Sequence, residues 1–252
     1  NINDEIVVQR SNIIIDGDGY TLQAIENGTG IDLTGRTNVT IKNMEIRLFD
    51  FGIDLSSACN NTVSENNITE NNLYAIRLFQ SSNNNTVSGN NITQNGDYSI
   101  LLYGSSSNNS IYGNYITGNY AGIGVFESSN NNSISENKID NNSLYGLVLF
   151  KCSNNTISRN NITSSGEFGI RIFESSYNSV FNNNFVNTGQ VETDSSVNAW
   201  NSSYPSGGNY WSNYTGDDFY NGPHQNITGS DGIGDTPYVI DADNQDNYPL
   251  MS

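Results

Sequence analysis
The sequence is poor in the residues that bind soft metals, form disulfides or attract polyanions. Its 252 residues contain two cysteines, two methionines and one histidine, and nine Lys and Arg residues stand against 26 Asp and Glu residues. The net charge of −17 argues against nucleic acid and anionic membrane surfaces, since both need basic side chains. No run approaches eighteen apolar residues, so we expect no membrane insertion. The first residue, Asn1, is not a methionine, which suggests a processed or trimmed product.

What the sequence does contain is an internal repeat. Apolar residues recur in three parallel series, mostly at steps of 23 or 24 residues. Segments such as NTISRNNI and FGIRIF nearly alternate apolar with polar residues, as half-buried strands do. Short strands at this period predict the coils of a parallel β-helix, stacked about 4.8 Å apart. The series are Val63, Val87, Ile111, Ile134, Ile157 and Val180; Ile68, Ile92, Ile116, Ile139, Ile162 and Phe185; and Ile53, Ile76, Ile100, Ile123, Leu147 and Ile170.

The repeat also defines the domain organisation. We predict one all-β domain, a solenoid of about eight coils of 22–24 residues. Residues 1–187 form the β-helix with its N-terminal cap. Residues 188–252 do not repeat, and they are expected to cover the open end or one flank of the helix, where strand edges would otherwise stay unpaired.

Asparagines follow the same period and predict ladders at two corners of the coil. Asn tolerates left-handed backbone, and its amide can bond the same amide one coil further on. The alternative is that these are surface turn residues without a ladder. The two series are Asn61, Asn85, Asn109, Asn132, Asn155 and Asn178; and Asn66, Asn90, Asn114, Asn137, Asn160 and Asn183.

Two further features follow from the coil positions. Cys59 and Cys152 fall on coils four apart, roughly 19 Å at 4.8 Å per coil, whereas a disulfide needs Cα atoms within about 7 Å. We therefore predict two free, poorly reactive thiols. Glycosylation sequons also recur, but the repeat itself generates them, so their number is weak evidence for glycans. Asn60, Asn84, Asn108, Asn131 and Asn154 are assigned to one corner, and Asn67, Asn91 and Asn161 to another.

The repeats NNTVSENNITENN and NNTISRNNIT, and above all the tail GGNYWSNYTG followed by DGIGDTPYVIDADNQDNYPLM, carry a family resemblance. They resemble the NosD-like parallel β-helix proteins of the archaeal cell-surface type, also described as carbohydrate-binding and sugar-hydrolysis (CASH) repeat domains. The resemblance covers nearly the whole chain. It implies a right-handed β-helix outside the cytoplasm. Some members of that family assist copper-site maturation, others are cell-surface proteins, and a few relatives act on polysaccharides.

The residues themselves bear on two of these activities. Copper sites use His, Cys and Met, but His224 lies in the turn-like NGPHQN and Met44 fits the core, so a copper accessory role is a second alternative. Glycosidases need two carboxylates about 5–10 Å apart, and Glu127 and Glu174 lie two coils apart. Lys151 occupies the coil between them, which indicates an alternating-charge ladder instead.

The acidic tail is the predicted metal site. Aspartates cluster there between Gly and Asn residues, and hard carboxylate oxygens on tight turns suit Ca²⁺. A solvated acidic loop is the alternative. The predicted ligands are Asp217, Asp231, Asp235, Asp241 and Asp243.

A row of aromatic residues is the predicted binding face. Each follows an inward-facing pair, so alternation points it outward, where stacked rings are costly to leave in water. Three explanations stay open: the tail with Trp200 and Trp211 folds over the row, the row is a protein–protein interface, or it is a platform on which sugars stack. The row is Phe79, Tyr103, Phe126, Phe150 and Phe173.

These observations predict a non-enzymatic extracellular or cell-surface protein, either a structural envelope component or a glycan-binding module. A polysaccharide hydrolase or lyase is the main alternative. The expected partners are a second copy of the chain or a polysaccharide, with Ca²⁺ as the candidate cofactor.

Overall fold

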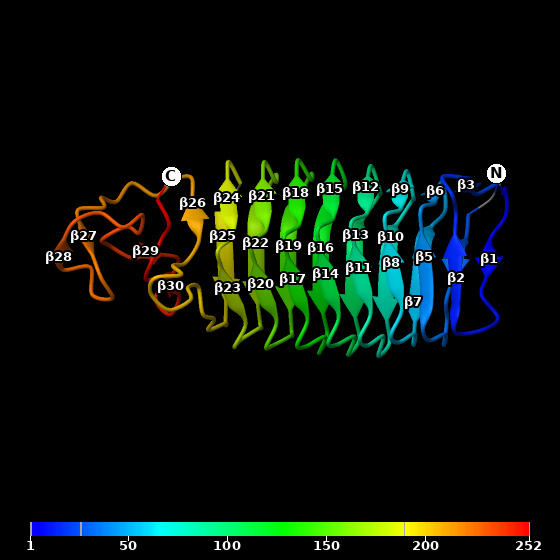
Figure 1. Cartoon of the computed structure of the whole chain (residues 1–252), viewed down its shortest axis with the longest axis horizontal. Helices are drawn as coiled ribbons and strands as arrows, with labels where there is room; N and C mark the ends of the chain where they lie inside the picture. Colours follow the sequence, from blue (N-terminus) through cyan, green and yellow to red (C-terminus); the bar gives the residue numbers. More distant parts are fainter. Residues whose placement is uncertain (1, 26, 189, 252) are drawn as a thin grey trace.

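The computed structural model describes residues 2–25, 27–188 and 190–251; Asn1, on which the processing prediction falls, lies outside them. In these residues the strands form three parallel sheets of nine, eight and nine strands, wound around one axis (Figure 1). The chain is therefore a right-handed parallel β-helix of about nine coils, close to the about eight predicted. Within the described ranges, no helical segment has the length and hydropathy needed to span a membrane.

Each coil contributes one strand to each sheet. Sheet 1 contains β1 (Ile6–Val7), β4 (Thr29–Asp32), β7 (Phe51–Ser56), β10 (Tyr74–Phe79), β13 (Tyr98–Tyr103), β16 (Ala121–Phe126), β19 (Tyr145–Phe150), β22 (Phe168–Phe173) and β25 (Gln190–Asp194). Sheet 2 contains β2 (Ile13–Asp16), β5 (Val39–Lys42), β8 (Thr62–Ser64), β11 (Thr86–Ser88), β14 (Ser110–Tyr112), β17 (Ser133–Ser135), β20 (Thr156–Ser158) and β23 (Ser179–Phe181). Sheet 3 contains β3 (Thr21–Gln23), β6 (Glu45–Arg47), β9 (Asn67–Thr69), β12 (Asn91–Thr93), β15 (Tyr115–Thr117), β18 (Lys138–Asp140), β21 (Asn161–Thr163), β24 (Asn184–Val186) and β26 (Tyr210–Trp211).

The three apolar series of the sequence form the core. Every member from Ile53 to Val180 is fully buried, and Phe185 is 2% exposed. The register repeats from coil to coil, as where Val87 pairs with Val63 on one side and Ile111 on the other. Identical side chains therefore stack along the axis, and this stacking buries a continuous apolar column that no single coil could provide.

Asparagine ladders line the corners, as predicted. The Asn114 amide nitrogen donates to Oδ1 of Asn137 at 2.9 Å, and Asn114 Oδ1 accepts from the amide nitrogen and the backbone N–H of Asn90, both at 3.0 Å. The structure adds a third ladder that the sequence analysis missed, at Asn71, Asn95, Asn119 and Asn142. Each buried amide thus satisfies the turning backbone of its neighbours, which water cannot reach.

One detail of the ladder prediction was wrong. The ladder asparagines do not take the left-handed backbone; the residue before each of them does, as at Glu65 (φ 58°) before Asn66 and Asn84 (φ 57°) before Asn85. The preceding residue makes the turn, and the ladder Asn then points its amide inward.

Cys59 and Cys152 are free thiols, as predicted. Cys152 takes a position in a ladder of buried serines, where its backbone N–H donates to the Ser175 hydroxyl oxygen at 3.1 Å. Burial raises the pKa of the Cys152 thiol to about 12. Because the thiolate is the reactive species, this cysteine is a poor nucleophile and a poor metal ligand at neutral pH.

The C-terminal segment closes one end of the helix and continues along its axis (Figure 1). Trp211 of β26 stacks on Phe185 and on Tyr238, with ring centroids 4.5 and 4.4 Å apart. The indole N–H groups of Trp200 and Trp211 donate to Asn244 Oδ1 and Asp246 Oδ2. The tail tryptophans are therefore part of the end cap and do not cover the aromatic row, which leaves the other two explanations of the row open.

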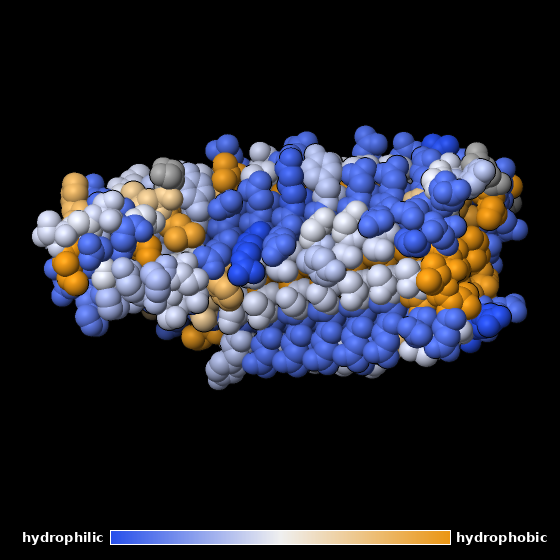
Figure 2. Space-filling model, in the orientation of Figure 1, coloured by the Kyte–Doolittle hydropathy of each residue, from blue (hydrophilic) through white to orange (hydrophobic). Residues whose placement is uncertain are grey.

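Two short hairpins complete this cap beyond the regular coils. They are β27 (Tyr220–Asn221) with β28 (Ile227–Thr228), and β29 (Tyr238–Val239) with β30 (Gln245–Asp246), both antiparallel. At the opposite end the first coil exposes apolar side chains, including Ile14 at 67% and Val7 at 49%; hydrophobic surface gathers at this end in Figure 2.

Candidate functional site
The predicted aromatic row lies on the outer face of sheet 1. Phe79 pairs with Tyr103, Tyr103 with Phe126, and so on through Phe150 to Phe173. Ring centroids are 5.4 Å apart for Phe79–Tyr103, 6.4 Å for Phe126–Phe150 and 4.4 Å for Phe150–Phe173. Tyr103 is 39% exposed and the other four are half-buried. The rings thus contact one another in two groups, Phe79 with Tyr103 and Phe126 through Phe150 to Phe173, and present their remaining surface outward.

A second aromatic row, which the sequence analysis missed, runs along the same face. Its rings stack where neighbours meet, with centroids 5.7 Å apart for Phe51–Tyr74 and 6.0 Å for Tyr145–Phe168. The row consists of Phe51, Tyr74, Tyr98, Tyr145 and Phe168, with Ala121 taking the position on β16.

Simple alternation could not place this second row. Counting outward positions back from Phe79 gives Arg77 and then Ala75, and would have put Tyr74 inside. In the structure Ala75 and Ile76 are both buried, so the alternation breaks once in each long strand and Tyr74 is outside. The signal that could have found the row was its period, because these aromatics recur every 23 or 24 residues like the first row.

Between the two rows, the middle strands of the face carry apolar residues without aromatic rings. Leu101 is 7% exposed and Val148 is 2% exposed, and Gly124 lies between them in the register. The rings of Tyr98 and Phe126 meet over Gly124 edge to face, with centroids 5.3 Å apart. A Cβ at Gly124 would lie 2.3 Å from the Phe126 ring, so only glycine lets the two rows close over this position.

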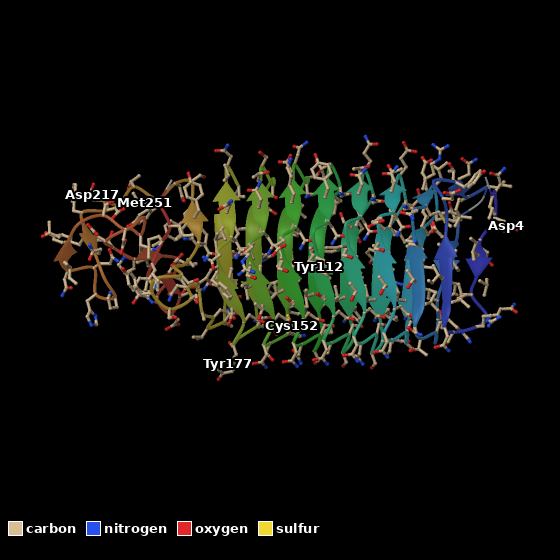
Figure 3. All side chains as sticks on the ribbon, viewed as in Figure 1. Asp4, Tyr112, Cys152, Tyr177, Asp217 and Met251 are labelled. Atoms are coloured by element: carbon tan, nitrogen blue, oxygen red, sulfur yellow. The ribbon has the colours of Figure 1, made fainter. Side chains whose placement is uncertain are left out.

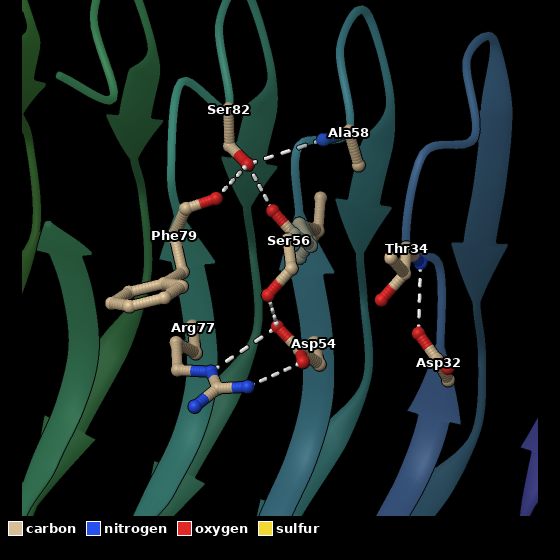
Figure 4. Close-up of polar contacts among 9 residues, drawn as sticks. Asp32, Thr34, Asp54, Ser56, Ala58, Arg77, Phe79 and Ser82 are labelled. Atoms are coloured by element: carbon tan, nitrogen blue, oxygen red, sulfur yellow. Dashed lines mark hydrogen bonds and ion pairs between the residues drawn. The ribbon is translucent and has the colours of Figure 1, made fainter. Parts of the chain in front are cut away.

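An arginine bridges the rows at each end of the face. Arg77 Nε donates to Asp54 Oδ1 at 3.2 Å, shown in Figure 4, and its guanidinium lies 4.0 Å from the Phe51 ring and 5.1 Å from the Phe79 ring. Arg171 repeats the arrangement, paired with Glu192. Its guanidinium lies over rings of both rows, 5.5 Å from Phe168 and 4.8 Å from Phe173. Each guanidinium thus extends the stacking surface while a carboxylate neutralises its charge.

One titratable pair borders the platform of the two rows. Asp97 precedes β13, and burial raises the pKa of its carboxyl despite the hydrogen bond from Tyr74. Burial, followed by the Asp97 charge, raises the pKa of the Tyr74 phenol. Burial also raises the pKa of Tyr98. The phenols therefore stay neutral at physiological pH and present O–H groups beside an apolar surface. Asp97 was not among the site residues predicted from the sequence.

One of the two carboxylates weighed for catalysis, Glu127, has an ion-pair partner. Lys151 Nζ lies 3.7 Å from Glu127 Oε1, and it also lies 4.6 Å from the Phe150 ring. The Glu127–Lys151 pair is thus the first half of the alternating-charge ladder that the sequence predicted, and the pairing of Glu174 stays a prediction.

The aspartates of the tail lie beyond the end of the helix, where Figure 3 labels Asp217. Their carboxylates hold the loops together: Asp235 accepts the backbone N–H groups of Phe219 and Tyr220, and Asp231 accepts that of Ile233. Asp241 accepts from the Asn244 amide and from Asp243 N–H. In the described part of the chain, no three His, Cys, Asp or Glu side chains gather as a metal-binding group. Calcium binding by this segment stays a prediction.

The donor set does not fit a copper centre. The soft donors are dispersed: Met44 is in the core at 6% exposure, Cys152 is a buried thiol with a raised pKa, and His224 is exposed on the loop after β27. Cys59 donates its thiol to the Ser81 carbonyl at the corner. Copper sites need such donors to converge on one point.

The fold and this face define a parallel β-helix with an extended aromatic outer surface. The sequence model of the family described as "Periplasmic copper-binding protein (NosD)" matches residues 11–216. The chain therefore belongs to the NosD family, as the tail motif and repeats indicated. That description places the family in the periplasm. No curated protein sequence matches the chain.

Several solved structures share the fold at low sequence identity. A double mutant of the periplasmic alginate epimerase AlgG aligns with a TM-score of 0.56 and 15% identity, over 71% of this chain and 53% of that one. The mannuronan C-5 epimerase AlgE4 A-module of Azotobacter vinelandii gives 0.53 and 14%, over 81% and 74%. Pectate lyase Pel9A gives 0.55 and 14%, over 79% and 66%. The chain thus spans about half the length of the AlgG structure. At these identities the similarity concerns the fold.

Proposed function
We propose that the chain is a glycan-binding module that acts outside the cytoplasm and holds an extended polysaccharide along the outer face of sheet 1. The observation that supports this most is the pair of aromatic rows. They are parallel, run across successive coils and stay uncovered by the tail, which caps the end instead. Aromatic rings with one exposed apolar surface and, in the tyrosines, a phenol at the tip suit sugar rings, which present C–H groups on one face and hydroxyls at the edge.

The charge of this face favours a neutral glycan. Both arginines of the platform are paired with carboxylates, Arg77 with Asp54 and Arg171 with Glu192. Lys151 is paired with Glu127. With these cations neutralised and a net charge of −17 on the chain, an acidic polysaccharide meets repulsion and gains no ion pair. The structural neighbours carry the names of alginate, mannuronan and pectate enzymes, which supports a glycan as the ligand class. The expected charge of the glycan is inferred instead from the paired cations on the outer face of sheet 1.

Affinity electrophoresis tests the proposal. The protein is run through native gels that contain a neutral polysaccharide such as glucomannan or xylan, or acidic alginate, beside a gel without polymer. We expect retardation in at least one neutral gel and none in alginate. Phe150→Ala removes a ring that stacks on Phe173 and meets Phe126 edge to face, and should abolish the retardation. Tyr112→Ala, an exposed tyrosine on sheet 2, is the matched control and should leave retardation unchanged. Equal loss in both variants, or no retardation in any neutral gel, contradicts the proposal.

Cleavage of the bound chain is the rival function, and Asp97 is the residue that supports it. Its carboxyl has a raised pKa and borders the aromatic platform, as a general acid would. The two-carboxylate mechanism needs a second group about 5–10 Å away, and Asp50 lies two coils from Asp97 at the same register position. The Asn72 amide donates to Asp50 Oδ1 at 3.1 Å, and Asp54 and Glu192 further along the face are each paired with arginine. Because these three carboxylates are each engaged by a neighbouring side chain, we propose binding without cleavage. New reducing ends released from a retained glucomannan, and lost in Asp97→Asn, would establish the rival.

A further inference from the structure
One corner of the β-helix repeats a glycosylation sequon in consecutive coils. It is the corner between sheet 1 and sheet 2, called here the 1–2 corner. The residue with left-handed backbone there is Asn in each of six successive coils, φ 55–58°, and a hydroxyl residue follows two positions later at the start of the sheet 2 strand. The six are Asn38, Asn60, Asn84, Asn108, Asn131 and Asn154.

Backbone conformation alone does not account for these asparagines. The corner between sheet 2 and sheet 3 has the same left-handed turn, and there the position holds Glu65 (φ 58°), Glu136 (φ 58°) and Arg159 (φ 57°). The corner between sheet 3 and sheet 1 holds Glu70 and Gln94 at φ 57°. This fold therefore accepts long side chains at the turn, and the 1–2 corner is the one that holds Asn in six consecutive coils.

Internal hydrogen bonding does not account for three of them either. Asn84, Asn108 and Asn131 are exposed, and within the described residues their side chains make no hydrogen bond to the protein, in contrast to the buried ladder asparagines that follow them. The sequon hydroxyls of Thr86 and Ser110 are likewise without a protein partner among these residues. The Nδ2 atoms of these three asparagines therefore stand free at the surface, two residues before a hydroxyl residue. The other three corner amides, those of Asn38, Asn60 and Asn154, donate to the side chains of Asn12, Thr37 and Ser153.

The sequons on sheet 3 differ. The sequence analysis assigned Asn67, Asn91 and Asn161 to a second corner, but each is the first residue of a strand, β9, β12 or β21. The Asn91 amide nitrogen donates to Asn67 Oδ1 at 2.8 Å. These asparagines lie within the strands of sheet 3, and the side chains of Asn67 and Asn91 are hydrogen-bonded to each other.

We propose that the 1–2 corner is a linear array of N-glycan acceptor sites. In the transfer, Asn Nδ2 forms a bond to the anomeric carbon of an oligosaccharide carried on a lipid diphosphate. The anomeric C–O bond breaks, the lipid diphosphate leaves with its electron pair, and one Nδ2 proton passes to the base of the transferase. Successive sites are about 4.8 Å apart, too close for two sugar chains side by side. One molecule therefore carries glycans on alternate coils, about three on six sites, along the edge beside the Phe79 row.

Site mapping tests the array independently of glycan binding by sheet 1. The whole chain is secreted from a host that N-glycosylates, and occupied sites are read from the Asn→Asp conversion that peptide-N-glycosidase leaves. We expect occupancy at the 1–2 corner to exceed that at Asn67, Asn91 and Asn161 several-fold, with intact mass showing about three corner glycans at most. Thr86→Val should remove the glycan at Asn84, whereas Ser88→Ala, on the same strand outside the sequon, should not. An unoccupied corner, or occupancy equal to that of the sheet 3 sequons, overturns the proposal.

Discussion

Replacing one ladder asparagine, Asn114, with alanine should destabilise the β-helix by several kcal/mol. Asn114 is 1% exposed. Its Oδ1 accepts the backbone N–H of Asn90, and its Nδ2 donates to the Val87 carbonyl, both at 3.0 Å. Alanine leaves these two backbone groups buried and unpaired. A buried group without a partner costs about 1–3 kcal/mol, so the two together predict a loss of roughly 2–6 kcal/mol in the free energy of unfolding.

The matched control is Asn91→Ala, one position after the ladder residue Asn90. Asn91 is exposed, and its amide donates only to the Asn67 side chain. Exposed substitutions of this kind change stability by about 0.5 kcal/mol or less. Urea denaturation followed by circular dichroism measures both variants, with the m-value checked for constancy. A loss below about 1 kcal/mol for Asn114→Ala, or a loss equal to that of the control, would refute the idea that the ladder amides satisfy the turning backbone.

Three further predictions concern the aromatic platform, the end cap and the tail. Gly124→Ala should force the Tyr98 and Phe126 rings apart, because its Cβ overlaps both, and should weaken retardation by glucomannan while the melting temperature falls only slightly; unchanged retardation counts against a role for the closed rows. Burial raises the pKa of Asp246 to about 6, above its unfolded value. Its contribution to the free energy of unfolding is therefore complete below about pH 4, and about 3 kcal/mol of stability is lost as the pH rises through 6. Tryptophan fluorescence during urea unfolding at each pH should show this slope flattened in Asp246→Asn, and an equal slope in both proteins would contradict it. If the tail binds calcium, the melting temperature should rise with Ca²⁺ and fall back with a chelator. An unchanged melting temperature would contradict the calcium prediction.

The fold was predictable because a solenoid repeats its physical requirements in every coil. The period of Val63, Val87 and Ile111 reports a buried stack directly, since each inward position meets the same position above and below. The asparagines of two ladders were found by the same period. The third ladder, which begins at Asn71, follows the same logic, but it is four residues long and ends at Ser165.

The site was predicted in part, because it depends on departures from the repeat. The row of Phe79 follows from alternation along a regular strand. The row of Tyr74 depends on the two consecutive buried residues before Arg77, and an irregularity of that kind is set by packing within the coil. Trp211 stacks on Phe185 of the last coil. Its position depends on how the non-repeating tail packs against that coil. No periodic signal carries that information.

Glycan binding on sheet 1 is tested most directly by three tyrosines of nearly equal exposure, one on each sheet. Tyr103 on sheet 1 is 39% exposed, Tyr112 on sheet 2 is 42% exposed and Tyr115 on sheet 3 is 38% exposed. Hydroxyl-radical footprinting measures their oxidation rates with and without a saturating neutral glycan that retards the protein. The account predicts that the glycan slows oxidation of Tyr103 several-fold and leaves Tyr112 and Tyr115 unchanged. Protection of Tyr112 or Tyr115 without protection of Tyr103 would contradict it.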